Sequence, residues 1–368
     1  MIPVNEPLLN GNEKKYLNEC IDTGWISSEG PFIKRFEEEF SSKTHKKHAV
    51  AVCNGTAALE IAVEALGIGK GDEVIIPAFT IISCASAIIK AGAVPVLVDS
   101  DINTWNMDVN QVEAKITSKT KAIMVVHIYG LPVDMDPLLA IAKKHNLKII
   151  EDSAEAHGQT YNGKPCGSFG DVSVFSFYPN KLITTGEGGM VLTDDDTVAE
   201  RLRSLRNLCF TASRRFVHEE LGWNMRMTNL QAAVGVAQLE RWEESINRKR
   251  VIGKLYTELL KDVKNISLPI VKTDYADNIY WVFGIISEDK NKTAEFIMKQ
   301  LGEKGIGTRP FFYPMHLQPV LKRMGLYQNE SYPNAEKMYD YGFYLPSGLA
   351  LTNEQIHEVV KSLKEILN

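Results

Sequence analysis

The chain has 368 residues, 44% of them hydrophobic, which is enough for a large core and predicts two domains rather than one. Its 41 basic and 46 acidic residues give a net charge of -5, so no uniform positive field draws it to nucleic acid or to an anionic membrane. No stretch approaches the roughly 20 apolar residues that a membrane span needs, and residues 1–6 do not begin a signal peptide. The five cysteines are far apart and form no C-x-x-C pair. They indicate buried thiols in a reducing compartment, so a cytoplasmic protein is expected.

Short apolar runs alternate with amphipathic segments over the first half of the chain. Amphipathic helices are expected near residues 57–66 and 137–145. Apolar strands joined by helical crossovers predict a mostly parallel sheet covered on both faces, with ligands bound beyond the carboxyl ends of its strands. The expected strands are 48–53, 73–77, 95–98, 121–126, 147–151, 172–177 and 190–193.

The second half of the chain predicts a smaller unit after a long helical region. Residues 222–260 are expected to be helical, and the run Arg248-Lys249-Arg250 within them is expected to form a solvated face. A strand near 280–286, a helix near 292–304 and a last helix from Asn353 follow. We place the domain boundary near residue 245, giving a large domain 1–245 and a small C-terminal domain 246–368.

The first chemical motif is Asn54-Gly55-Thr56, at the junction of a strand and a helix. Free amides at a helix start, a glycine that allows close approach and a hydroxyl together form a phosphate cradle. Alone the motif is weak, because Thr56 could simply cap the helix.

Two acidic residues follow the strand that ends near residue 151. Asp152 lies at the end of that strand, and Glu155 follows one turn later. Acidic residues are common at helix starts, where they suit the helix dipole, so Glu155 also has this ordinary interpretation. His127 ends the preceding strand and is as well explained as a hydrogen-bonded core histidine.

Lys181 follows Ser176 at the end of another apolar strand and leads into the glycine-rich segment 184–189. Its amine is therefore expected at the mouth of the sheet, where glycines let other groups approach. This is the setting of a lysine that forms a Schiff base with pyridoxal 5'-phosphate (PLP). That cofactor also needs phosphate donors and an acid opposite its ring nitrogen, for which Asp152 is the candidate. Glu155 could reach the ring hydroxyl.

The last motif is Gly222-Trp223-Asn224-Met225-Arg226-Met227-Thr228-Asn229, a polar loop before the long helical region. Thr228 or Asn229 could cap that helix. Together, N-G-T, E-D-x-A-E, S-F-x-x-x-K with T-T-G-E-G-G, and G-x-N-x-R-M-T-N resemble the DegT/DnrJ/EryC1/StrS family of sugar aminotransferases. The resemblance extends from Trp25 through the segment 308–316.

The resemblance implies fold type I of the PLP-dependent aminotransferases, with a mostly parallel seven-stranded sheet, a smaller α/β C-terminal domain and active sites shared by a homodimer. Lys181 would be the Schiff-base lysine, with Asp152 and Glu155 in the roles above. Gly55, Thr56 and Ser176 would bind the phosphate, joined by Asn224 of the other subunit. Many relatives have a ring-stacking aromatic residue where this chain has Ile81, which would cover the cofactor by apolar contact. Residues 178–180 also differ from the aromatic-Gly-Asn pattern of the most similar relatives.

The expected reaction moves the amino group of L-glutamate to a nucleotide-linked keto-sugar. Within the family, the resemblance favours members that convert GDP-4-keto-6-deoxymannose to GDP-perosamine. Another 3-keto or 4-keto sugar nucleotide, a smaller keto-phosphate, or a catalytically idle PLP-binding relative remain alternatives. The candidate substrate contacts are Trp25, Ser27, Arg309, Tyr313 and His316, although Tyr313-Pro314 also suits an ordinary turn.

Overall fold

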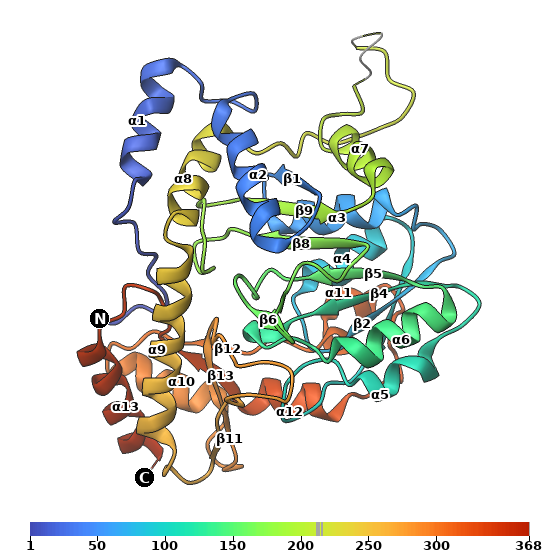
Figure 1. Ribbon diagram of the computed structural model, residues 1–368. Coiled ribbons are helices and arrows are strands. Elements are labelled where there is room, and N and C mark those ends of the chain that lie inside the picture. The colour runs from blue at the N-terminus through green and yellow to red at the C-terminus, as the bar shows by residue number, and fades with distance from the viewer. Residues whose placement is uncertain (211–213, 215, 368) are drawn as a thin grey trace.

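A seven-stranded sheet forms the centre of the larger part of the molecule (Figure 1). The computed structural model describes residues 1–210, 214 and 216–367. The strands are ordered β1-β9-β8-β5-β4-β2-β3, and β9 alone runs in the opposite direction to the other six. Their bounds are β1 His48–Val52, β2 Glu73–Pro77, β3 Val94–Val98, β4 Thr120–Val126, β5 Lys148–Asp152, β8 Val172–Ser176 and β9 Gly189–Thr193. The predicted sheet is confirmed, and each predicted strand end lies within one residue of the observed one.

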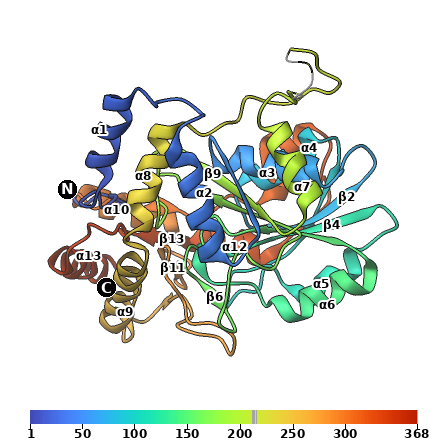
Figure 2. The ribbon, with the colours of Figure 1, turned by 45° about the horizontal axis from the view of Figure 1, so that its top comes forward.

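Helices cover both faces of this sheet because its strands are apolar on both sides. In β2, Val74 and Ile76 join the core beneath one set of helices, whereas Ile75 faces the other set. Figure 2 shows the two layers on opposite sides of the strands. One layer contains α3 (Gly55–Ala65), α4 (Ile82–Lys90) and α7 (Asp196–Leu205), and the other contains α5 (Val109–Val112) and α6 (Met135–His145).

Three further helices form a separate core cluster with β1, β8 and β9. They are α1 (Glu13–Thr23), α2 (Pro31–Thr44) and α8 (Asn229–Leu239). The helical region expected over 222–260 starts later than Gly222 and consists of two helices. Thr228 caps α8 with a capping box to Gln231, which fixes the start at Asn229, and α9 (Trp242–Leu260) begins as a second helix.

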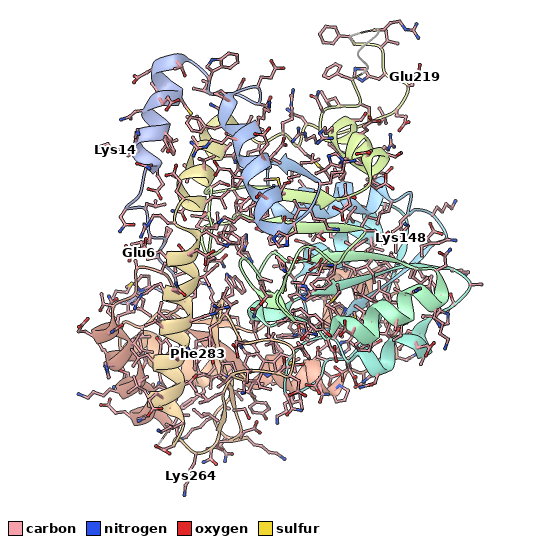
Figure 3. All side chains as sticks on the ribbon, viewed as in Figure 1. Glu6, Lys14, Lys148, Glu219, Lys264 and Phe283 are labelled. Atoms are coloured by element: carbon pink, nitrogen blue, oxygen red, sulfur yellow. The ribbon has the colours of Figure 1, made fainter. Side chains whose placement is uncertain are left out.

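The C-terminal part contains a four-stranded antiparallel sheet in the order β10-β11-β13-β12. Phe283 lies in the core of this part (Figure 3). The charged residues that the figure labels elsewhere in the molecule, Lys14, Lys148, Glu219 and Lys264, are exposed at its surface. The expected strand near 280 starts later, at Phe283, because Tyr280 has a left-handed φ of 56°. The predicted helices α10 and α13 are confirmed. The elements are β10 Ile266–Ser267, β11 Phe283–Ser287, α10 Ala294–Glu303, β12 Arg309–Pro310, α11 Pro319–Arg323, α12 Pro333–Tyr341, β13 Gly342–Leu345 and α13 Asn353–Leu367.

Short elements complete the described chain. They are the hairpin of β6 (Thr160–Tyr161) and β7 (Lys164–Pro165) and the 3-10 helices η1 (Glu113–Lys115), η2 (Ile128–Gly130) and η3 (Met315–Leu317). None of the helices described here has the length and apolar character needed to cross a membrane.

The first residues of the chain form an N-terminal strap, residues 1–6, that lies against the C-terminal part. Ile2 is buried in its core, and the carbonyl of Val4 accepts a hydrogen bond from the amide of Ser347 at 3.0 Å. The side-chain amide of Asn5 donates to the carbonyl of Pro179 at 3.0 Å. The strap therefore connects the small sheet to the loop that precedes Lys181.

The structure contradicts the expectation that Lys249 belongs to a solvated helix face. Its side chain is buried, with 1% exposure, and not part of a solvated face. It projects from the inner side of α9, and its ammonium donates to the carbonyl oxygens of Trp281 at 2.7 Å and Ser347 at 2.5 Å. The charged neighbours in the sequence conceal this inward orientation.

Candidate active site

A cavity of about 980 Å³ lies where the carboxyl ends of the parallel strands meet the C-terminal part of the chain. Its position agrees with the rule that open α/β sheets bind ligands at that edge. Both halves of the chain contribute to the wall. The wall includes Gly55, Thr56, Ile81, Ser83, Asp152, Glu155, Ser176 and Lys181 from the large sheet and its helices, and Trp281, Arg309 and Tyr313 from the C-terminal part.

The N-terminus of α3 offers two backbone donors to this cavity. Asn54 caps the helix by accepting from the amide of Ala57 at 2.8 Å, so Thr56 is not the cap. Within the described residues, the amides of Gly55 and Thr56 donate to no protein acceptor. A side chain on Gly55 would place its Cβ 2.8 Å from the Cβ of Ser176, so only glycine fits. Free amides beside two hydroxyl side chains form a suitable anion site.

Asp152 places a buried carboxylate in the wall, at the end of β5. Its side chain accepts from the amide of Ala154 at 3.0 Å and from the thiol of Cys84 at 3.5 Å. No lysine, arginine or histidine in the described part of the chain forms a salt bridge with it. Burial raises the pKa of Asp152, because its hydrogen bonds and the charge of Lys181 do not fully offset the cost of burying its charge. A cationic ring nitrogen would supply the remaining compensation.

Lys181 and Glu155 form a close pair in the same wall. The Nζ of Lys181 lies 3.7 Å from the Oε1 of Glu155, and both side chains are nearly buried. Burial lowers the pKa of Lys181 although the two neighbouring carboxylates oppose the shift, and burial raises the pKa of Glu155 to about 7. Both shifts favour the uncharged groups, so the lysine amine releases its proton more readily than an exposed lysine does.

Backbone geometry orients both members of the pair. The amide of Tyr129 donates to the Oε2 of Glu155 at 2.8 Å, and Tyr129 adopts a left-handed φ of 55° as it does so. The loop carrying Lys181 is closed by the amide of Phe177, which donates to the carbonyl of Gly188 at 2.8 Å. A Cβ on Gly188 would lie only 2.2 Å from Thr185 Oγ1, so the loop requires glycine there.

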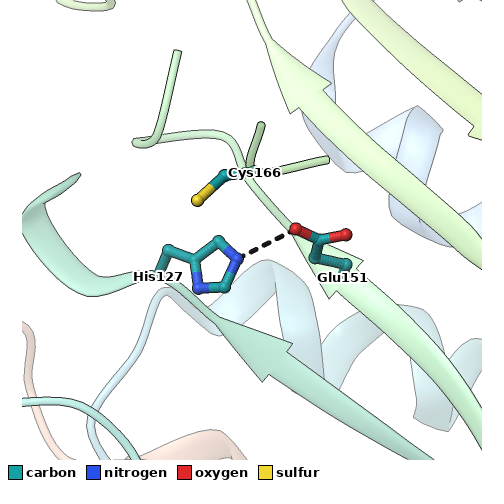
Figure 4. Close-up of side chains that lie close together, drawn as sticks. All are labelled: His127, Glu151 and Cys166. Carbon is teal, nitrogen blue, oxygen red and sulfur yellow. Dashed lines mark hydrogen bonds and ion pairs between the residues drawn. The ribbon is translucent and has the colours of Figure 1, made fainter. Parts of the chain in front are cut away.

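A second buried cluster contains His127, Glu151 and Cys166 (Figure 4). His127 Nε2 lies 3.0 Å from Glu151 Oε1, and His127 Nδ1 accepts from the amide of Val133 at 3.2 Å. Burial opposes ionisation of Glu151, but His127 and the loop amides hold its pKa at about 2. Glu151 also accepts from the amides of Gly167, Phe169 and Gly170 and from the hydroxyls of Ser153 and Ser173. Because protein donors occupy these oxygens and His127 uses both ring nitrogens, the cluster anchors the 167–170 loop to β5 and does not offer a ready metal site.

The predicted substrate residues fall into two groups. Arg309 and Tyr313 line the cavity, with the Tyr313 ring 4.7 Å from that of Tyr339. His316 does not line it, because its buried side chain pairs with Glu336 at 2.9 Å, and we leave it out of the site. Trp25, Ser27 and Asn224 are exposed and lie outside the wall of their own chain's cavity.

The structure adds four residues that the sequence did not single out for this site: Tyr129, Trp281, Ser83 and Cys84. The Oγ atoms of Ser83 and Thr56 are 2.9 Å apart, and the Trp281 ring centroid is 3.8 Å from Lys181 Nζ. The position of Tyr129, three residues after the end of β4, was an available signal, since residues near strand ends gather at this edge. Nothing in the local sequence indicates that Trp281 reaches Lys181 across 100 residues.

Comparison with known proteins gives a consistent assignment. The model of the DegT/DnrJ/EryC1/StrS aminotransferase family matches residues 7–364. The chain is 45% identical to GDP-perosamine synthase of Escherichia coli O157:H7, over 99% of this chain and 98% of that protein. It is 44% identical to GDP-perosamine synthase of Caulobacter vibrioides, over 100% of this chain and 98% of the relative.

A solved structure of similar shape is the putative sugar aminotransferase Spr1654 of Streptococcus pneumoniae in its PMP form. The TM-score is 0.93 at 28% identity, with coverage of 100% of this chain and 97% of the other. The expected family and fold are therefore confirmed. The protein belongs to the DegT/DnrJ/EryC1/StrS aminotransferase family and has the fold of PLP-dependent sugar aminotransferases.

Proposed function

We propose that this enzyme transfers the amino group of L-glutamate to GDP-4-keto-6-deoxymannose and forms GDP-perosamine, with PLP as cofactor. The observation that carries the proposal is the placement of Lys181, Asp152 and the free amides of α3 around one cavity. The choice of sugar rests on the full-length similarity to two GDP-perosamine synthases at 44–45% identity.

The residues present fit PLP. The free amides of Gly55 and Thr56, with the hydroxyl of Ser176 beside them, would hold the phosphate. Asp152 would hold a proton on the ring nitrogen, and Ile81, which is 43% exposed in the wall, would cover the ring. When bound, PLP supplies an electron sink that stabilises the carbanion left when the α-proton of the donor departs.

The chain itself contributes proton transfer and orientation. Lys181 takes and returns the proton at Nζ, which its lowered pKa allows. Glu155 is oriented by the amide of Tyr129, and its carboxylate lies next to the amine of Lys181. It would also approach the hydroxyl of the cofactor ring. Arg309 and Tyr313 supply a guanidinium and a phenol at the rim, suited to a carboxylate or a diphosphate.

We further propose a homodimer in which each subunit completes the site of the other. Asn224 is exposed and bonded only to Arg226 Nε, at 3.0 Å, among its described side-chain contacts. Trp25, Ser27 and Asn224 have no place in their own cavity, and Trp25 is 50% exposed, as expected for side chains that act across an interface. In this proposal Asn224 of one subunit joins the phosphate site of the other, while Trp25 and Ser27 line its substrate entrance.

The division into a large domain 1–245 and a small domain 246–368 is retained as part of the proposal, with the N-terminal strap packed on the small domain. All five cysteines are free thiols, which fits a location in the reducing cytoplasm.

The test loads the purified protein with PLP and follows the visible absorbance of the bound cofactor. Glutamate is added first, then a panel of keto-sugar nucleotides and keto-phosphates. Loss of the band with glutamate and its return with GDP-4-keto-6-deoxymannose alone would support the proposal. Return with another keto compound alone would refute the substrate, and no response to glutamate would indicate an idle PLP-binding relative. Lys181→Ala, treated identically, is the control.

A further inference from the structure

Trp281 lies directly against the reactive amine. The Nζ of Lys181 is 3.8 Å from the centroid of the Trp281 ring, within the range of a cation–π contact. Trp281 is 4% exposed and belongs to the wall of the cavity, so water does not screen this contact strongly. By contrast, Lys181 Nζ is 3.7 Å from Glu155 Oε1, which is longer than a hydrogen bond. The amine therefore lies between a carboxylate and an aromatic face, at similar distances from both.

Two hydrogen bonds and one ring contact fix the position of Trp281: one bond from the indole, one to the backbone carbonyl, and the ring packing. Its Nε1 donates to the carbonyl of Asn180 at 2.9 Å, so it is tied to the residue that precedes Lys181. Its own carbonyl accepts from the ammonium of Lys249 at 2.7 Å. Its ring packs against that of Tyr129, with centroids 6.0 Å apart. Rotation of the indole away from Lys181 would break at least the first of these contacts.

The other charges near Lys181 come from several elements. Glu155 and Asp152 favour its charged form, whereas burial opposes it. Lys249 donates to the backbone carbonyl of Trp281, and its pKa is lowered by burial and by the like charge of Lys181. His157 is buried and its pKa is lowered to about 3, because burial disfavours the imidazolium, so it is neutral here. The ring of Trp281 adds a cation–π attraction for the ammonium to the attraction of the two carboxylates.

We infer that Trp281 is a positioning residue that holds the amine of Lys181 over its indole face whenever that amine is not bonded to the cofactor. The inference rests on the proposed function, in which the lysine is released during each half-reaction. The ring holds the ammonium beside Glu155, in the wall of the cavity. It also makes the C-terminal part of the chain responsible for the position of a catalytic group on the large sheet.

The test is a series of proteins in which only Trp281 is replaced by a fluorinated tryptophan, with more fluorine atoms on the ring in each successive protein. Fluorine weakens the negative face of the ring while nearly preserving its shape. The full chain without cofactor is labelled with acetic anhydride across a pH series, and modification at Lys181 is read by peptide mass spectrometry against exposed Lys264. The pKa of Lys181 is expected to fall with each fluorine, by about one unit over the series.

The matched control places the same residues at Trp105, which is equally buried at 4% exposure and contacts Tyr129 and Phe311. Equal Lys181 titration curves in both series would overturn the inference. A downward shift confined to position 281 would support it. Because labelling needs neither cofactor nor substrate, a failure of the inference and a failure of the keto-sugar assay are separate results.

Discussion

The substitution Lys249→Met removes a buried ammonium that has only neutral oxygen partners. Lys249 is 1% exposed and donates to two backbone carbonyls, and none of the carboxylates described in the structure forms a salt bridge with it. Burial lowers its pKa to about 7, and the nearby charge of Lys181 adds to the shift. The unfolded chain keeps the ordinary lysine pKa of about 10.4. Between these two pH values the unfolded state therefore binds more protons than the folded state.

The sign follows from that difference. Burying the charged group costs most below pH 7, where it is protonated in both states. The cost decreases as the pH rises toward the unfolded pKa, so the free energy of unfolding of the wild type increases with pH. From pH 7 to pH 9 this single group contributes an increase of about 2 kcal/mol. Methionine has a similar side-chain length but no group that ionises. It also leaves two carbonyls without a donor, at a cost that does not depend on pH.

The assay is equilibrium urea unfolding of the cofactor-free wild type and of Lys249→Met at closely spaced pH values from 7 to 9. The difference between the two free energies of unfolding is expected to rise by about 2 kcal/mol over that interval in favour of the wild type. Lys254→Met, at an exposed position of the same helix, is expected to show no such slope. A constant difference for Lys249→Met would refute the reasoning, because it would mean that the buried lysine stays fully charged in the native state.

Three other predictions concern the site and its support. Lys181→Ala is expected to lower kcat by at least about 10³-fold while the circular dichroism spectrum is unchanged; near-normal turnover would remove the lysine from the mechanism. Gly55→Ala places a Cβ 2.8 Å from that of Ser176, so PLP affinity, measured by absorbance titration, is expected to fall about 10-fold or more. Affinity equal to wild type would place the phosphate elsewhere. The pKa of Glu151, held at about 2, gives the carboxylate a stabilising effect that is full above the unfolded value and is lost as the pH falls toward 2. Glu151→Gln is therefore expected to lower the free energy of unfolding at pH 7 by about 3 kcal/mol, and an unchanged urea midpoint would contradict this.

The sequence predicted the large sheet closely because each of its strands is a short apolar run between helical segments. Lys181 and Asp152 could be found for the same reason, since each lies directly at the end of such a run and strand ends gather at one edge. The break between α8 and α9 could not be read from the apolar pattern, which continues across Glu240 and Arg241. A side-chain cap at Thr228 set the start of α8, and the sequence offered that residue only as one option.

The remaining parts of the site depend on contacts between distant segments. Lys249 lies between two arginines, a pattern typical of a solvated face, and only the packing of α9 on the small sheet reveals its orientation. Trp281 lies in an apolar stretch that predicts a strand and nothing more. Its contact with Lys181 exists because the C-terminal part closes over the edge of the large sheet. Sequence periodicity carries no information on such an approach.

The N-terminal strap has a consequence for how the protein is made. Val4 finds its partner at Ser347, and Asn5 contacts Pro179, so segments from the beginning, middle and end of the chain meet beside the loop of Lys181. During translation, Val4 can therefore reach its final contact only after Ser347 has been made. The strap beside the loop of Lys181 is thus completed later than the strands of the large sheet, all of which precede residue 194.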